Sequence, residues 1–178
     1  MTKKFTDRKI INGVFDGVKL NQPSSYQDYR GYYYTINDTE DNDVEYVKDK
    51  LSTSSKNVLR GIHGDYKSTK LVTCVHGEVY CVIVDNRKNS DTYMEWAWEI
   101  LSVHNKNILV LPPGVGLSYL ITSESANIFY KWAYPGGYPD VDDQFTLKWN
   151  DKSLKIFWPI KEPILQPRDL WLKYLKKW

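Results

Sequence analysis

The sequence lacks a long apolar run, and no stretch of it approaches the ~20 apolar residues that a membrane-spanning helix needs. Its first residues are polar and charged, without the apolar core of a secretory signal peptide. We therefore expect no membrane partner and a cytoplasmic location. The chain has only two cysteines, Cys74 and Cys81, with no CxxC spacing. They are predicted to be free, buried thiols, which suits a reducing compartment.

Net charge is also nearly absent, because 24 Lys and Arg oppose 22 Asp and Glu to give +2. The positive charges gather mainly near the two ends of the chain, which we interpret as solvated termini. A basic surface that could bind a polyanion is therefore not indicated, and we expect no nucleic-acid partner.

Histidine is scarce too: the chain has three, His63, His76 and His104. No HxH or HxxxH pair exists, so we expect no metal site. His76 and His104 are interpreted as ordinary loop residues. His63 stands at a strand end and could be a general base, since imidazole titrates near neutral pH. From spacing alone, a histidine that is merely hydrogen-bonded there is the simpler interpretation.

What the sequence does contain is aromatic residues, 15% of the chain with 14 Tyr and 7 Trp, a composition that suits β-strands. Short apolar runs separated by turn residues predict many strands in one domain, residues 1–178. We expect hairpins of 71–75 with 78–84 and of 118–122 with 127–133. Further strands are expected at 10–20, 44–47, 94–101, 108–111 and 145–149, with 51–56 as a connection and 167–177 as a helix. This pattern predicts an all-β jelly roll of two packed antiparallel sheets with a short C-terminal helix.

A series of motifs points to a known family. They occur in this order: Asp28-x-Arg30-Gly31-Tyr32, Asn57-Val58-Leu59-Arg60-Gly61-Ile62-His63, Lys70-Leu71-Val72, Gly77-Glu78-Val79-Tyr80, Val84-Asp85-Asn86-Arg87, Pro112-Pro113-Gly114, Tyr130-Lys131, Trp149-Asn150-Asp151 and Trp158-Pro159. Over roughly residues 10–170 the chain resembles the dTDP-4-dehydrorhamnose 3,5-epimerase family of cupin-like jelly rolls. The resemblance implies a nucleotide-sugar epimerase, an isomerase that needs no cofactor and forms a homodimer.

The resemblance also implies site residues. His63 falls on the catalytic base, Asp169 on its carboxylate partner, Tyr130 on the general acid and Lys70 on the lysine beside the substrate ketone. Arg60 and Arg30 fall on arginines that hold the diphosphate. The other expected substrate-binding residues are Lys48, Lys50, Tyr32, Leu117, Ser118, Tyr119 and Tyr134. Taken singly, Tyr130 could instead be a core ring and Asp169 a charge at a helix start.

The chain also departs from the family pattern. Gly114-Val115-Gly116-Leu117-Ser118-Tyr119 stands where the family has Gly-Phe-Ala-His-Gly-Phe, so Leu117 replaces a pocket histidine. Cys81 replaces a frequent Asp, Lys48-Asp49-Lys50 replaces Gln-Asp-Asn, and the segment between His63 and Lys70 is short. Residues 62–65, 122–126 and 143–146 resemble the branch that acts on GDP-4-keto-6-deoxy-heptoses for bacterial capsules.

These features lead us to expect inversion at C3, or at C3 and C5, of an NDP-4-keto-6-deoxy sugar carried on GDP or dTDP. A GDP-linked heptose is the first choice of substrate. Two alternatives stay open: a sugar-nucleotide 3,4-ketoisomerase on a similar jelly roll, and a sugar-binding jelly roll without turnover.

Overall fold

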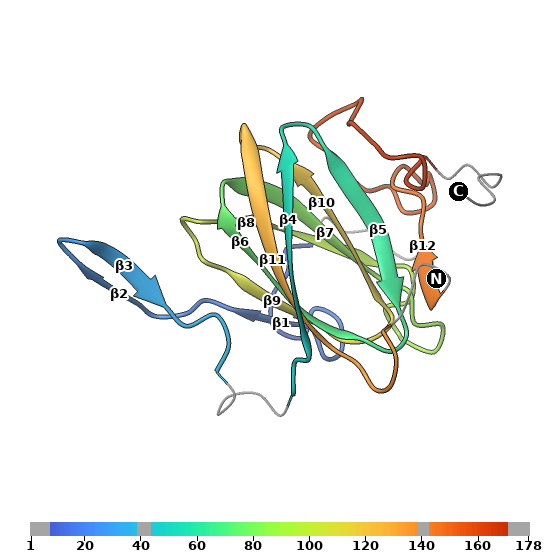
Figure 1. The fold of residues 1–178 in the computed structure, drawn as a ribbon. Helices are drawn as coiled ribbons and strands as arrows, with labels where there is room; N and C mark the ends of the chain where they lie inside the picture. Colours follow the sequence, from blue (N-terminus) through green and yellow to red (C-terminus); the bar gives the residue numbers. More distant parts are fainter. Residues whose placement is uncertain (1–7, 39–43, 139–142, 171–178) are drawn as a thin grey trace.

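The computed structural model describes residues 8–38, 44–138 and 143–170, and within these ranges the chain is all-β with no helix (Figure 1). The strands are β1 (Lys19–Asn21), β2 (Ser25–Asp28), β3 (Gly31–Tyr34), β4 (Lys48–Ser55), β5 (Leu59–Asp65), β6 (Thr69–His76), β7 (Glu78–Asp85), β8 (Trp96–Ser102), β9 (Ile108–Leu111), β10 (Val115–Ile121), β11 (Ser125–Ala133) and β12 (Gln144–Thr146).

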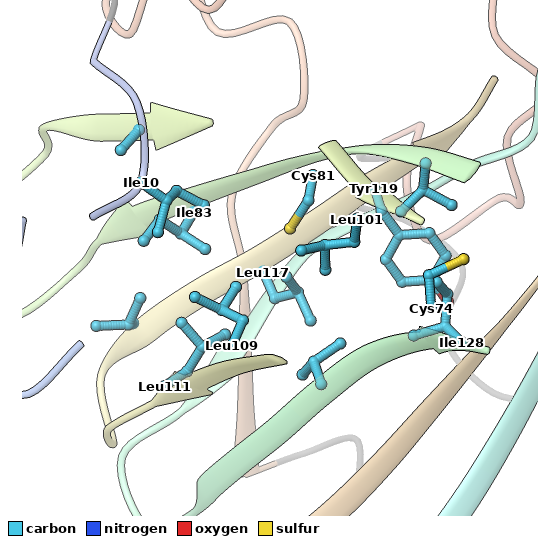
Figure 2. Packing of buried hydrophobic residues seen from close by; sticks show 14 of the residues in the cluster. Ile10, Cys74, Cys81, Ile83, Leu101, Leu109, Leu111, Leu117, Tyr119 and Ile128 are labelled. Atoms are coloured by element: carbon cyan, nitrogen blue, oxygen red, sulfur yellow. The ribbon is translucent and has the colours of Figure 1, made fainter. Parts of the chain in front are cut away.

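Two five-stranded antiparallel sheets form the body of the molecule. One has the order β1-β9-β6-β11-β4 and the other β12-β5-β10-β7-β8. Between them lies a continuous apolar core that includes both cysteines, and Figure 2 shows Leu117 and Tyr119 among its side chains. Both thiols are free and buried, as predicted. Burial raises the pKa of Cys74 to about 11 and raises that of Cys81 as well.

The two expected hairpins are wrong in their pairing, although their four strands exist. β6 and β7 lie in different sheets, and so do β10 and β11. The short link at Gly77 therefore carries the chain from one sheet to the other. Gly77 has φ 75°, and a Cβ there would come within 2.1 Å of the Ser125 carbonyl oxygen. Two apolar runs joined by a tight turn look alike in sequence whether they pair or cross over.

Three other boundaries also differ from expectation. Residues 51–56, expected as a connection, belong mostly to β4, and 44–47 precede that strand. Residues 10–20 are mainly turns and contribute only the start of β1. Of the expected helix 167–177, residues 167–170 form a turn and the rest lies outside the described residues.

The sequence failed to predict strand β4 for a physical reason. Along this edge strand the burial alternates, so that Lys50, Ser52 and Ser54 face inward while Leu51 is exposed. Side chains two apart share one face of a strand. The inward face is therefore polar, which is the reverse of the pattern expected for a strand over an apolar core.

The C-terminal segment covers the outer face of the sheet that contains β5. Leu147, Trp149, Trp158 and Leu165 pack against a second apolar cluster on that face. Ile164 pairs with the start of β5, since its N–H donates to the Asn57 carbonyl at 2.8 Å. This path returns residues 166–169 to the side of β5. No helix in the part of the chain that the structure describes is long and apolar enough to cross a membrane.

Candidate active site

A cavity of about 300 Å³ is lined by side chains from both sheets and from the returning C-terminal segment. Its lining consists of Lys50, Ser52, Arg60, His63, Lys70, Leu117, Tyr119, Tyr130, Trp132, Tyr138, Gln144, Gln166 and Arg168. Four of these residues are cationic and none is acidic. The arrangement suits an anionic ligand such as a diphosphate.

His63 projects from β5 and meets Asp169 of the C-terminal turn, with 2.6 Å between Nε2 and Oδ1. The Asp169 side chain is fully buried, and no other described residue hydrogen-bonds to either carboxylate oxygen. The turn is held by the Asp169 N–H, which donates to the Gln166 carbonyl at 2.9 Å. A proton kept on Nε2 by this carboxylate leaves Nδ1 as the nitrogen that can accept another.

Lys70 lies at the start of β6 and is almost completely buried. Its ammonium forms an ion pair with Asp65 at 2.8 Å and lies 4.5 Å from the centre of the Trp132 ring. Burial lowers the pKa of Lys70, and the nearby Asp65 charge offsets only part of that effect. Burial acts to raise the pKa of Asp65, but the Lys70 charge and two backbone N–H groups outweigh it, so the net shift is downward.

Tyr130 on β11 belongs to a short series of hydroxyls. It donates to the Tyr119 hydroxyl at 2.7 Å, and Tyr119 donates to Ser52 Oγ at 3.1 Å. Burial raises the pKa of Tyr119 and raises that of Tyr130 well above its ordinary value. Both phenols are therefore held in the protonated form, which is the form that a general acid requires.

Cations and rings gather around the rest of the cavity. Lys50 contacts the Tyr138 hydroxyl and lies over the rings of Trp132 and Tyr138. Arg168 donates to Thr146 Oγ1 at 3.1 Å and to Gln144 Oε1 at 3.2 Å. These two neutral acceptors hold the Arg168 guanidinium beside Asp169.

The structure brings together most of the residues that the sequence suggested. His63, Lys70, Tyr130, Arg60, Lys50, Leu117 and Tyr119 all line the cavity, and Asp169 contacts His63. Ser118 does not line it, since its buried hydroxyl donates to the Arg60 carbonyl at 2.8 Å. Lys48 and Tyr134 also lie outside the lining, each against the Tyr138 ring.

Arg30 and Tyr32 lie apart from the cavity, on the β2–β3 hairpin that projects from the sandwich (Figure 1). Arg30 forms an exposed ion pair with Asp28 there. The same hairpin exposes several tyrosine rings, with Tyr29 96% and Tyr33 70% exposed.

Six lining residues were not foreseen: Ser52, Trp132, Tyr138, Gln144, Gln166 and Arg168. Two of them had a usable signal. Trp132 follows Tyr130 by two positions and Ser52 follows Lys50 by two, so each shares a strand face with a residue already singled out. Arg168 precedes Asp169 directly, but nothing local marks Gln144 or Tyr138. Within the described ranges, no three His, Cys, Asp or Glu residues are grouped as metal ligands would be.

An all-β sandwich with a histidine, a buried ammonium and a protonated phenol around a cationic cavity defines a jelly-roll protein with the kinds of group that proton transfer requires. Residues 13–177 match the family described as dTDP-4-dehydrorhamnose 3,5-epimerase. The Escherichia coli K12 protein named dTDP-4-dehydrorhamnose 3,5-epimerase is 35% identical over 170 residues, 90% of each chain.

Solved structures agree with this. The Bacillus anthracis dTDP-4-dehydrorhamnose 3,5-epimerase, with TDP and PPi bound, superposes with a TM-score of 0.83 at 32% identity, over 91% of this chain and 96% of that one. A Legionella pneumophila homologue in complex with dTDP-4-keto-L-rhamnose gives 0.81 at 31% identity, over 92% and 89%. The chain belongs to the dTDP-4-dehydrorhamnose 3,5-epimerase family and is an isomerase of the epimerase type. The predicted family and fold class are thus confirmed.

Proposed function

We propose that this chain is a cytoplasmic, cofactor-independent epimerase that inverts C3 of an NDP-4-keto-6-deoxy sugar. The observation that carries the proposal is the shared cavity, in which His63, Lys70 and Tyr130 meet without an acidic lining residue. A 3,4-ketoisomerase would use a similar base, and a sugar-binding protein would need neither base nor acid.

The proposed chemistry follows from the acidity of a hydrogen beside a ketone. His63, held by Asp169, removes the C3 hydrogen as a proton. The electron pair moves onto the C4 oxygen, and the Lys70 ammonium stabilises the resulting enolate. Tyr130 then donates its proton to the opposite face of C3, and the ketone is restored with C3 inverted. Arg60, Lys50 and Arg168 are suited to the diphosphate.

Inversion at C3 alone is favoured over inversion at C3 and C5. Leu117 lines the cavity where the family pattern has a histidine, and Cys81 lies in the apolar core where that pattern often has Asp. An apolar side chain can neither relay a proton nor hydrogen-bond a sugar hydroxyl. This pocket therefore has fewer groups with which to control a second centre.

For the substrate, we propose a GDP-linked 4-keto-6-deoxy-heptose of the kind used in capsule biosynthesis. Its support is the resemblance of residues 62–65, 122–126 and 143–146 to the branch that acts on such sugars. The second candidate is a dTDP-4-keto-6-deoxy-hexose, which is favoured by the names of the relatives.

We also propose a homodimer in which each β2–β3 hairpin reaches the partner's cavity. The hairpin stands clear of its own sandwich and carries Arg30 and Tyr32 together with exposed tyrosine rings (Figure 1). Tyrosine and arginine are enriched in protein interfaces. A fully active monomer in light scattering would contradict this arrangement.

The experiment that tests the function is incubation with candidate GDP- and dTDP-4-keto sugars in D₂O, read by mass and by NMR. A C3 epimerase adds one deuterium to the product after brief turnover. Comparable incorporation at C3 and C5 would show a double epimerase, and a product with its carbonyl moved to C3 would show a ketoisomerase. A protein that only binds sugars would incorporate none.

A further inference from the structure

The three hydroxyls of Tyr130, Tyr119 and Ser52 form a connected chain beside the site of proton transfer. Tyr130 donates to Tyr119 at 2.7 Å, Tyr119 donates to Ser52 at 3.1 Å, and all three residues line the cavity. Tyr130 and Ser52 come from β11 and β4 of one sheet, whereas Tyr119 comes from β10 of the other. This chain of three hydroxyls therefore bridges the two sheets.

Tyr119 is a core residue in every respect except its hydroxyl. Its ring packs within the apolar cluster between the sheets (Figure 2), and the residue is only 4% exposed. A phenylalanine would fill the same space, and the family pattern has phenylalanine here. The Tyr119 hydroxyl therefore contributes to the hydrogen bonds with Tyr130 and Ser52 rather than to the packing of the core.

The proposed reaction creates a need for such a chain. Each C3 inversion leaves Tyr130 as a phenolate and His63 as an imidazolium, so a proton must return to Tyr130 before the next turnover. Burial disfavours the phenolate strongly. Leu117, at the cavity position where the family pattern has histidine, has no proton to give.

Resting on the proposed function, we infer that Tyr119 and Ser52 form a proton relay that restores the Tyr130 hydroxyl after each turnover. A phenol can both donate and accept, so the hydrogen bonds of the chain can reverse. Tyr119 passes its proton to the Tyr130 oxygen and takes the Ser52 hydroxyl proton in the same movement. Ser52, partly exposed on the edge strand β4, takes a proton from a water molecule, which leaves as hydroxide. His63 gives the proton from C3 to another water molecule, so no net charge is left.

Tyr119→Phe separates the relay from the chemical step. In single turnover, with enzyme in excess over the 4-keto sugar in D₂O, Tyr130 starts protonated, and incorporation should proceed at nearly the normal rate. In steady state, turnover should fall by about tenfold, less than the ~10²–10⁴-fold expected for loss of the acid itself in Tyr130→Phe. Small acidic buffers such as imidazole should restore the steady-state rate of Tyr119→Phe. Ser52→Ala should show the same split with a smaller loss.

The matched control is Tyr66→Phe. This variant also loses a hydrogen-bonded hydroxyl. The Tyr66 hydroxyl donates to the Asn86 backbone carbonyl and accepts from the Asn86 side-chain amide. Tyr66 does not line the cavity. Its steady-state rate should be unchanged. Equal slowing of Tyr119→Phe in single turnover and in steady state, without rescue by buffer, would overturn the relay and leave a structural role for the hydroxyl.

A second measurement needs no substrate, so it remains informative if the proposed reaction fails. In protein labelled with ¹³Cζ-tyrosine, the Tyr130 signal can be assigned at neutral pH from its absence in Tyr130→Phe. The Tyr130 hydroxyl donates to the Tyr119 hydroxyl at 2.7 Å. Tyr119→Phe removes this hydrogen bond and should therefore shift the Tyr130 ¹³Cζ resonance. A Tyr130 resonance unchanged by Tyr119→Phe would show that the hydroxyls are not coupled in solution and would overturn the inference. Wild-type protein that exchanges no carbon-bound hydrogen would instead reject the epimerase.

Discussion

Two buried aspartates in this fold differ sharply in the hydrogen bonds that their carboxylates accept. Asp85 and Asp169 both have fully buried side chains. Asp85, outside the cavity, accepts hydrogen bonds from Arg87, Ser90 and Thr92. Asp169 contacts the His63 ring and has no hydrogen bond to its carboxylate from any other described residue.

We propose that the difference separates a structural carboxylate from one that acts on a neighbouring side chain. Burial acts to raise the pKa of Asp85, but its donors outweigh this and lower the pKa to about 2. That network ties the turn after β7 together. Asp169 contacts the His63 ring, so its effect should appear in the orientation of His63 rather than in the fold.

The largest effect is expected for His63→Asn, which removes the proposed base. Exchange at every centre should fall by ~10²–10⁴-fold, because general-base catalysis contributes that much. Binding of the nucleotide diphosphate, measured by calorimetry, should stay close to normal. A variant with near-normal exchange would show that His63 is not the base. Asp169 would then have no catalytic partner to distinguish it from Asp85.

Lys70→Met tests the ion pair between Lys70, which lines the cavity, and the buried Asp65. Loss of the ammonium should slow exchange by ~10²–10³-fold, the magnitude typical for one group that stabilises an oxyanion. The ammonium is the form that the proposed mechanism requires, and its pKa is lowered, mainly by burial. Wild-type activity should therefore decline as pH rises through that lowered pKa, earlier than for an exposed lysine. The alkaline limb of a kcat profile measures this, and it should be absent from the residual activity of Lys70→Met.

Asp169→Asn should cost about 10²-fold in kcat, at the low end of acid–base effects, because His63 remains but loses its orienting charge. Since Asp169 has few hydrogen bonds to lose, the midpoint of urea unfolding should change little. A large loss of stability with normal kcat in the folded fraction would place Asp169 in the same structural class as Asp85.

The sequence predicted the fold only in part. The strands β6, β7, β9 and β11 were foreseen because their apolar runs end at turn residues. Their partners were not, because a tight turn such as that at Gly77 can either fold a strand back in its sheet or carry it to the other sheet. β4 was missed because its inward face is polar, and it is polar because it lines the cavity.

The same reasoning applies to the site. His63, Lys70, Tyr130 and Asp169 came from the family resemblance, not from spacing, since they are brought together by a sandwich and a returning C-terminal segment. Gln144 and Tyr138 were missed because their role depends on long-range placement. The two-residue period of β4 and β11 would have found Ser52 and Trp132 once those strands were known.

The smallest effect on catalysis, and the clearest one on stability, is expected for Asp85→Asn. The folded pKa of about 2 lies below the ordinary 3.8, so ionised Asp85 stabilises the fold by about 2 kcal/mol. A lowered carboxylate pKa gives a contribution that is complete above about pH 4 and is lost as pH falls toward about pH 2. Urea unfolding near neutral pH should therefore show Asp85→Asn less stable by at least this amount, and the gap should narrow in acid. Because Asp85 does not line the cavity, kcat of the folded protein should be unchanged. A gap that stays constant from pH 7 to pH 2 would mean that the ionised carboxylate is not what stabilises the turn, and Asp85 would no longer be the structural counterpart of Asp169.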